Sequence, residues 1–168
     1  MMDEQISTSL TGYGRTATSY QFACEPLSPA LEEASDLLQE HYEELATYKG
    51  DIPLDPDYNA YRKAAKFDML RVFTARVEGR LVGYAVFFVR PHHHYKSTKW
   101  AQMDIVLIDK QYRNAGLGSG LVTCIENTLK REGVHVIHWT TKVEHPVLGL
   151  LLESFGYKHV EQGYSKRL

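Results

Sequence analysis

The segment Asp109–Val122, DKQYRNAGLGSGLV, combines an arginine with three glycines at alternate positions. An apolar stretch that ends near Ile108 precedes it, and a helical pattern starts near Leu117. The first turn of a helix leaves backbone N–H groups without acceptors and carries partial positive charge. Glycines let an anion approach those groups, and Arg113 adds a fixed positive charge. The segment is therefore predicted to bind a diphosphate.

Two common phosphate-binding loops do not fit this segment. The dinucleotide-binding fingerprint requires a third glycine where this chain has Leu121, and an acidic residue about 20 positions later. The following stretch HVIHWTTK contains no acid. The P-loop requires a lysine after its last glycine, which this chain lacks. The alternative to a diphosphate site is an ordinary glycine-rich turn before a core helix.

Asp104 stands within the otherwise apolar stretch AQMDIVLI, shortly before the glycine segment. An acid at this position is a candidate general base. The alternatives are an acid that pairs with a neighbour for structural reasons and one that faces solvent.

A run of three histidines, His92, His93 and His94, lies in the stretch PHHHYKST. Adjacent residues of an extended loop point in different directions, so a single ion would not be bound by all three. We therefore predict no metal site. Contact with a substrate and a solvated loop remain as alternatives for these residues.

The surrounding pattern predicts the elements that position these groups. Strands are indicated by YQFACEPL, MLRVFTARV, LVGYAVFFVR, KWAQMDIVLI, VHVIHWTTK and YKHVEQGYSKRL. Helical spacing follows Ser28, Asp55, Leu117 and His145, and Glu78-Gly79 suits a hairpin turn. The order β-α-α-β-β-β-α-β-α-β predicts one mixed α/β domain over residues 20–168. A flexible arm is expected over residues 1–19.

Length and composition restrict the class of protein. The 168 residues fit one domain, and a formal charge of −2 gives no general attraction to nucleic acid. The apolar fraction of 43% supports a globular core. Cys24 and Cys124 do not form a short pair, which argues against zinc and favours a reducing compartment. Because no stretch predicts a signal peptide or a membrane span, we expect a cytoplasmic protein.

The segment VLIDKQYRNAGLGSGLV resembles the acetyl-coenzyme A loop of the GNAT superfamily of N-acetyltransferases. The tail LLLESFGYKHVEQGYSKRL, with its Gly156-Tyr157 step, also resembles that family. The stretches IPLDP, VGYAVFFVRPHHHY and YSKRL resemble acetyltransferases carried by bacteriophages and prophages. The resemblance implies a single-domain fold with a mixed, mostly antiparallel sheet flanked by helices.

The resemblance also implies acetyl-coenzyme A as co-substrate and assigns residues to it. The pyrophosphate would bind backbone amides of the loop, with Arg113 shaping the turn, and the pantetheine arm would bind backbone groups of the preceding strand. The residues so assigned are Val106, Leu107, Ile108, Arg113, Asn114, Ala115, Gly116, Leu117, Gly118 and Ser119.

The general acid is harder to assign. The family often places an asparagine at the start of the penultimate helix and a tyrosine seven residues later, as the acid for the thiolate. This chain has His145 and Leu152 at those positions, and leucine cannot donate a proton. His145 is either a pantetheine contact that takes over proton transfer or a plain helix-start residue.

The acceptor implied by the resemblance is an amine, carried by a small molecule, a protein or an RNA. Because the first two helices of this family line the acceptor cleft, Glu40, Glu43 and Glu44 are candidates to attract a cationic amine. A module that binds acyl-coenzyme A without turnover is the alternative that the missing tyrosine favours. The final hairpin of this family often pairs subunits, so a homodimer is a further expectation.

Overall fold

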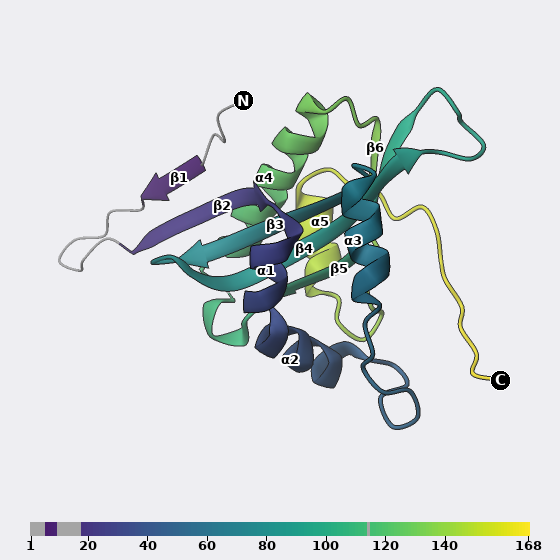
Figure 1. The fold of residues 1–168 in the computed structure, drawn as a ribbon, viewed down its shortest axis with the longest axis horizontal. Coiled ribbons are helices and arrows are strands. Elements are labelled where there is room, and N and C mark those ends of the chain that lie inside the picture. The colour runs from purple at the N-terminus through teal and green to yellow at the C-terminus, as the bar shows by residue number, and fades with distance from the viewer. Residues whose placement is uncertain (1–5, 10–17, 114) are drawn as a thin grey trace.

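The computed structural model describes residues 6–9, 18–113 and 115–168. Its centre is a six-stranded sheet with the strand order β1-β2-β3-β4-β5-β6 (Figure 1). Neighbouring strands are antiparallel except β5 and β6, which are parallel. The strands are β1 (Ile6–Ser9), β2 (Ser19–Glu25), β3 (Leu70–Val77), β4 (Arg80–Pro91), β5 (Lys99–Ile108) and β6 (Val136–His138). The helices are α1 (Leu27–Glu33), α2 (Ser35–Leu45), α3 (Tyr58–Lys66), α4 (Leu117–Arg131) and α5 (Val147–Ser154), with a short 3-10 helix η1 (Lys110–Tyr112).

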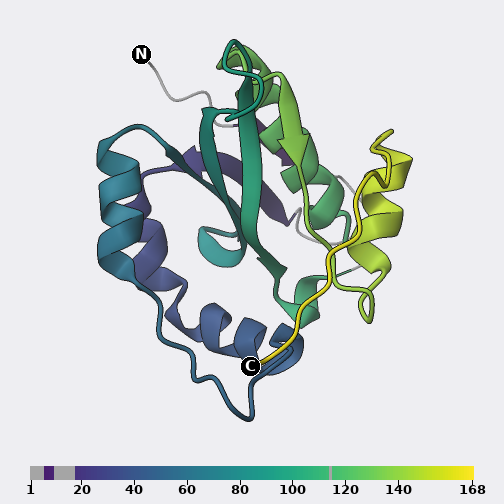
Figure 2. The same ribbon diagram turned by 90° about the vertical axis from the view of Figure 1, so that its right-hand side faces the viewer.

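Helices cover both faces of the sheet, which confirms the expected fold class (Figure 2). The helices α4 and α5 lie on one face, and α1, α2 and α3 lie on the other. The apolar stripe of α4 is buried against the sheet, with each side chain at most 2% exposed: Leu117, Leu121, Ile125 and Leu129. Among the described residues, no helix has both the length and the apolar character needed to cross a membrane.

One irregularity in β5 changes which face its side chains cover. Across the β4–β5 ladder Val86 pairs with Ile105, and the next residue of β4 pairs with Met103, so Asp104 is an extra residue. Met103 packs in the core beneath α4, whereas Ile105 packs against the core beneath α1–α3. In a regular strand, residues two positions apart share one face. The bulge at Asp104 therefore reverses the alternation of the strand.

The final strand expected over residues 157–168 is wrong, because no residue of this fully described segment belongs to a strand. Val160 is 72% exposed, so burial of apolar side chains does not drive pairing of this segment. The tail instead runs toward the loop after α2 (Figure 2). There Ser165 Oγ and Tyr48 Oη share a hydrogen bond of 2.9 Å, and Arg167 pairs with Asp51 at 2.6 Å.

Other boundaries also differ from the sequence prediction. The range 1–19 contains β1, which pairs with β2 in register from Ile6↔Phe22 to Ser9↔Ser19. The first predicted helix is divided at Ala34 into α1 and α2. The hairpin turn at Glu78-Gly79 is confirmed, since both residues have positive φ angles of 50° and 83°, as a type I′ turn requires.

Gly120 in the first turns of α4 lies directly against Phe22 of β2, and a Cβ atom there would overlap the phenyl ring. We expect Gly120→Ala to lower the free energy of unfolding by about 1–3 kcal/mol, because a buried ring would have to move. Gly149 in α5 has no atom within 4 Å of such a Cβ. The control Gly149→Ala should raise stability by about 0.5–1 kcal/mol through helix propensity. Urea unfolding measures the free energy of unfolding of both variants. Equal stabilisation by the two changes would contradict the close contact between Gly120 and Phe22.

Candidate functional site

The strands β5 and β6 separate after a short parallel ladder. Their last pair is Gln102↔His138, where β6 ends, while β5 continues to Ile108. In the described part of the chain, no strand lies beside this later half of β5 on its β6 side. Its backbone groups there, which include those of residues 106–108, can bind an extended ligand in the manner of an added strand.

The N-terminus of α4 lies next to the end of β5. Gly116 precedes the helix in the left-handed conformation, with φ 78°, and no described side chain caps this end. The first N–H that bonds within the helix is that of Gly120, to Gly116 O at 3.1 Å. The three N–H groups before it have no acceptor inside an α-helix; they belong to Leu117, Gly118 and Ser119.

The exposure of this turn fits an anion site. Ala115, Gly116 and Ser119 are exposed, whereas Leu117 is buried. Uncapped N–H groups at an accessible helix N-terminus attract phosphate groups. Asn114, which was also assigned to the coenzyme, lies outside the described residues.

Gly118 belongs to the first turn of α4 and also packs against neighbouring elements. A Cβ atom at this position would lie 3.0 Å from Leu151 Cδ2 of α5 and 3.9 Å from Ile108 Cδ1 of β5. The absence of a side chain therefore brings α4 close to α5 and to the end of β5. A substitution of Gly118 would disturb this packing and ligand binding together, so other positions test binding more cleanly.

Arg113 connects the loop to β5 and to α2. Its Nε donates to Ile108 O at 2.8 Å, and its Nη1 and Nη2 donate to the two carboxylate oxygens of Glu44 at 2.7 and 2.8 Å. These hydrogen bonds from Arg113 are the main cause that lowers the pKa of Glu44 to about 2. Glu44, a sequence candidate for attracting the acceptor, is thus engaged with the coenzyme loop.

Asp104 projects from the bulge in β5, directly after the segment that pairs with β6. Its carboxylate is exposed and accepts a hydrogen bond of 2.6 Å from Tyr61 Oη of α3. Burial, followed by the hydrogen bond to Asp104, raises the pKa of Tyr61, so this phenol keeps its proton and acts as the donor. The carboxylate is therefore held in place beside the open edge of β5.

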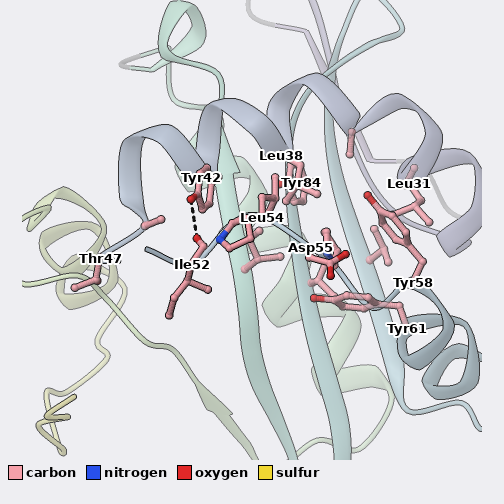
Figure 3. Close-up of a pocket in the computed structure, with 18 of the residues that line it drawn as sticks. Leu31, Leu38, Tyr42, Thr47, Ile52, Leu54, Asp55, Tyr58, Tyr61 and Tyr84 are labelled. Carbon is pink, nitrogen blue, oxygen red and sulfur yellow. Dashed lines mark hydrogen bonds between the residues drawn. The ribbon is translucent and has the colours of Figure 1, made fainter. Parts of the chain in front are cut away.

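A cavity of about 590 Å³ lies between the sheet and the helices α1–α3 (Figure 3). Leu31 and Leu38 line it from α1 and α2, and Leu54 lines it from the loop before α3. Tyr84 and Ile105 line it from the sheet. Because Ile105 follows Asp104, the cavity adjoins the bulge.

The remaining sequence candidates lie on other elements than Asp104. His145 is exposed just before α5 and is close enough to Glu44 to help lower the pKa of that carboxyl. Asp104, in contrast, is bound to α3 through Tyr61. Leu152, where the family often has tyrosine, is 5% exposed and belongs to the core.

The three histidines lie at the β4–β5 hairpin tip, which projects beyond the sheet (Figure 1). The ring of His92 packs on Trp100 and Tyr95, with centroids 4.2 and 4.9 Å away. His93 Nε2 is 3.1 Å from Arg90 Nη1. Among the residues that the structure describes, no three His, Cys, Asp or Glu side chains are grouped to hold a metal ion.

Three residues of the site were not identified from the sequence. Tyr61 was assigned only to a helical stripe, and its partner Asp104 lies 43 positions away. Tyr84 is 4% exposed, and Nδ1 of His41 is buried. Neither the Tyr84 hydroxyl nor His41 Nδ1 has a hydrogen-bond partner among the described residues. Burial lowers the pKa of His41. Strand and helix periodicity gives no signal for such pairings, because it reports only which face is apolar.

Comparisons with known proteins place this geometry in a family. The sequence matches the acetyltransferase (GNAT) family over residues 32–157. A search of curated proteins finds no match. A solved transcriptional regulator from Bacillus halodurans C-125 has a TM-score of 0.71 and 21% identity, over 89% of this chain and 99% of that chain.

Two solved acetyltransferases share the fold at similar distance. A ribosomal-protein-alanine N-acetyltransferase from Brucella melitensis biovar Abortus 2308 has a TM-score of 0.68 and 17% identity, over 89% of this chain and 99% of that chain. An aminoglycoside N-acetyltransferase in complex with CoA has a TM-score of 0.70 and 15% identity, over 92% of this chain and 97% of that chain. Because the family match spans most of the sequence, the chain belongs to the acetyltransferase (GNAT) family, and it is an N-acetyltransferase that uses acetyl-coenzyme A.

Proposed function

We propose that the chain transfers the acetyl group of acetyl-coenzyme A to a primary amine that enters the cavity beside β5. The observation that carries this proposal is the place of Asp104. Its carboxylate stands at the bulge, between the open edge of β5 and the cavity lined by Ile105. A donor bound along the edge and an acceptor in the cavity would meet at this carboxylate.

The residues present suit the coenzyme. Its diphosphate would bind the exposed and uncapped amides at the start of α4, where Gly116 has φ 78°. Its pantetheine arm would run along the backbone of residues 106–108, and Arg113, fixed to Ile108 and Glu44, would keep the loop in shape. When bound, the coenzyme supplies an acetyl thioester. Ala115 and Asn114 complete the proposed binding loop.

Asp104 is proposed as the general base. As the amine nitrogen bonds to the acetyl carbon and the carbon–sulfur bond breaks, the amine proton passes to Asp104. The departing sulfur then needs a proton, and Leu152 has none to give. We propose that His145, exposed before α5, carries this proton from solvent.

Cytoplasmic location, a phage-type origin and a homodimer stay predictions from the sequence.

Ser119 offers a test of the diphosphate site, because it is exposed in the first turn of α4. We expect Ser119→Glu to weaken acetyl-coenzyme A binding at least ~10-fold, since the added carboxylate repels the diphosphate. The same charge favours the helix dipole, so stability should not fall. The control Asn127→Glu adds an equal charge two turns later on the exposed side of α4. Calorimetry that finds equal affinity for both variants would place the coenzyme elsewhere.

Asp104→Asn separates a base from a structural partner. The amide can still accept the hydrogen bond of Tyr61 but cannot take a proton, so we expect kcat/KM to fall by ~10²–10⁴-fold. The deficit should shrink as pH rises and free amine becomes abundant. The matched variant Tyr61→Phe keeps the carboxylate and should lose less activity. Thiol release measured from pH 6 to 10 distinguishes a general base from a structural partner at position 104. Equal losses at every pH would assign Asp104 to structure, and no turnover by the unmodified protein with any amine would favour a binding module.

The pair of Glu44 and Arg113 predicts a pH dependence of stability. The pKa of Glu44 falls from an ordinary value of 4.5 to about 2 in the folded chain. The pair therefore stabilises the fold fully above pH 4.5, and this contribution is lost as pH falls from about 4.5 to about 2. The thermal midpoints of the unmodified protein and Glu44→Gln should differ at pH 6 and converge toward pH 2. A difference that stays constant over this range would contradict the ion pair.

A further inference from the structure

The cavity between the sheet and the helices α1–α3 is lined mostly by apolar side chains, with a few polar groups among them. Asp55, Tyr58 and Tyr61 lie together at one end of the view, near Leu31, and Tyr42 and Ile52 lie toward the other end (Figure 3). Leucine and alanine side chains of α1 and α2 extend the apolar wall: Leu27, Ala30, Leu31, Ala34 and Leu38. A volume of about 590 Å³ falls within the range of sites for small-molecule ligands.

Tyr84 contributes a buried hydroxyl to the wall of the cavity. Its side chain lines the cavity and is 4% exposed, and its hydroxyl has no hydrogen-bond partner among the described residues. A buried hydroxyl without a partner destabilises a fold, and phenylalanine would fill the same space without that penalty. Tyr61, which donates a hydrogen bond of 2.6 Å to Asp104, lines the same cavity as Tyr84.

We propose that the acceptor is a primary amine carried on an apolar body. Its amino group would arrive as ammonium among Asp104, Tyr61 and Tyr84 and release one proton to solvent through Asp104 before the neutral nitrogen attacks. Its body would pack against the leucine and alanine wall. Phenol oxygens accept hydrogen bonds from an ammonium group, and aromatic faces attract cations. This inference rests on the proposed function and names the substrate class of that same site.

The charges of the cavity argue against strongly polar acceptors. Among the described residues that line it, the ionisable side chains other than tyrosine are Asp55 and Lys142. Lys142 Nζ donates to Thr47 Oγ1 at 3.1 Å. An acceptor with several ammonium groups, or with a phosphate group, would leave charges unpaired against leucine side chains.

The test uses the full chain, acetyl-coenzyme A and a panel of amines, with thiol release as the readout. The apolar amines are 2-phenylethylamine and octylamine, and the polar ones are spermidine, kanamycin and glucosamine 6-phosphate. We expect kcat/KM to be at least ~100-fold higher for the apolar amines. Equal or higher values for a polar amine would overturn the substrate class but leave the transferase function intact. Silence with every amine, despite coenzyme binding, would count against the proposed function itself.

Tyr84→Phe removes one hydroxyl from the cavity wall without loss of packing volume. We expect the KM for 2-phenylethylamine to rise ~10–150-fold, the loss of one hydrogen bond to a charged group. The thermal midpoint should stay equal or rise, because no partner is left behind. The control Tyr95→Phe changes a tyrosine that is 58% exposed at the hairpin tip and should alter neither quantity. A lowered thermal midpoint with unchanged KM would show a structural role for the hydroxyl and overturn the proposal.

Discussion

The proposed chemistry of this fold depends on the extra residue in β5. At Asp104 the strand loses its match with β4, and its side chains exchange faces. The pairing with β6 has ended two residues earlier, so the bulge and the divergence of the two strands occur together. A regular strand at this point would continue the ladder and leave its backbone groups paired. The end of β6 therefore leaves the open edge that a coenzyme arm needs, and the bulge beside it places the exposed Asp104 carboxylate next to that edge.

The two sides of the site are joined by long-range polar contacts as well as by packing on the sheet. Arg113 connects the coenzyme loop to α2 through Glu44, and Tyr61 connects the bulge to α3. The guanidinium is 37% exposed and the carboxylate 15%, so screening by solvent limits the stability that this pair adds. Its bidentate geometry is better suited to fixing orientation. These contacts thus fix the position of the helices that line the cavity relative to the loop that would bind the donor.

Sequence patterns predicted the structural features that depend only on residues close together in the sequence. The stripe from Leu117 to Leu129 and the positive φ angles at Glu78 and Gly79 follow from helix spacing and turn chemistry. The partners Tyr61–Asp104 and Glu44–Arg113 are separated by 43 and 69 positions, so no local period contains them. The final strand was predicted from the sequence pattern and from the family resemblance, yet its side chains are mostly exposed and its polar groups bond to the loop after α2.

Those tail contacts also affect access to the cavity. Ser165 lines it and bonds to Tyr48, and Arg167 pairs with Asp51 where both side chains are about half exposed. Exposed ion pairs and single surface hydrogen bonds contribute little net stability. The apolar wall and the tyrosines, by contrast, belong to helices and strands packed on the sheet. The cavity therefore combines walls of packed helices and strands with a rim held by exposed polar contacts, so opening of the rim would cost less free energy than opening of the walls.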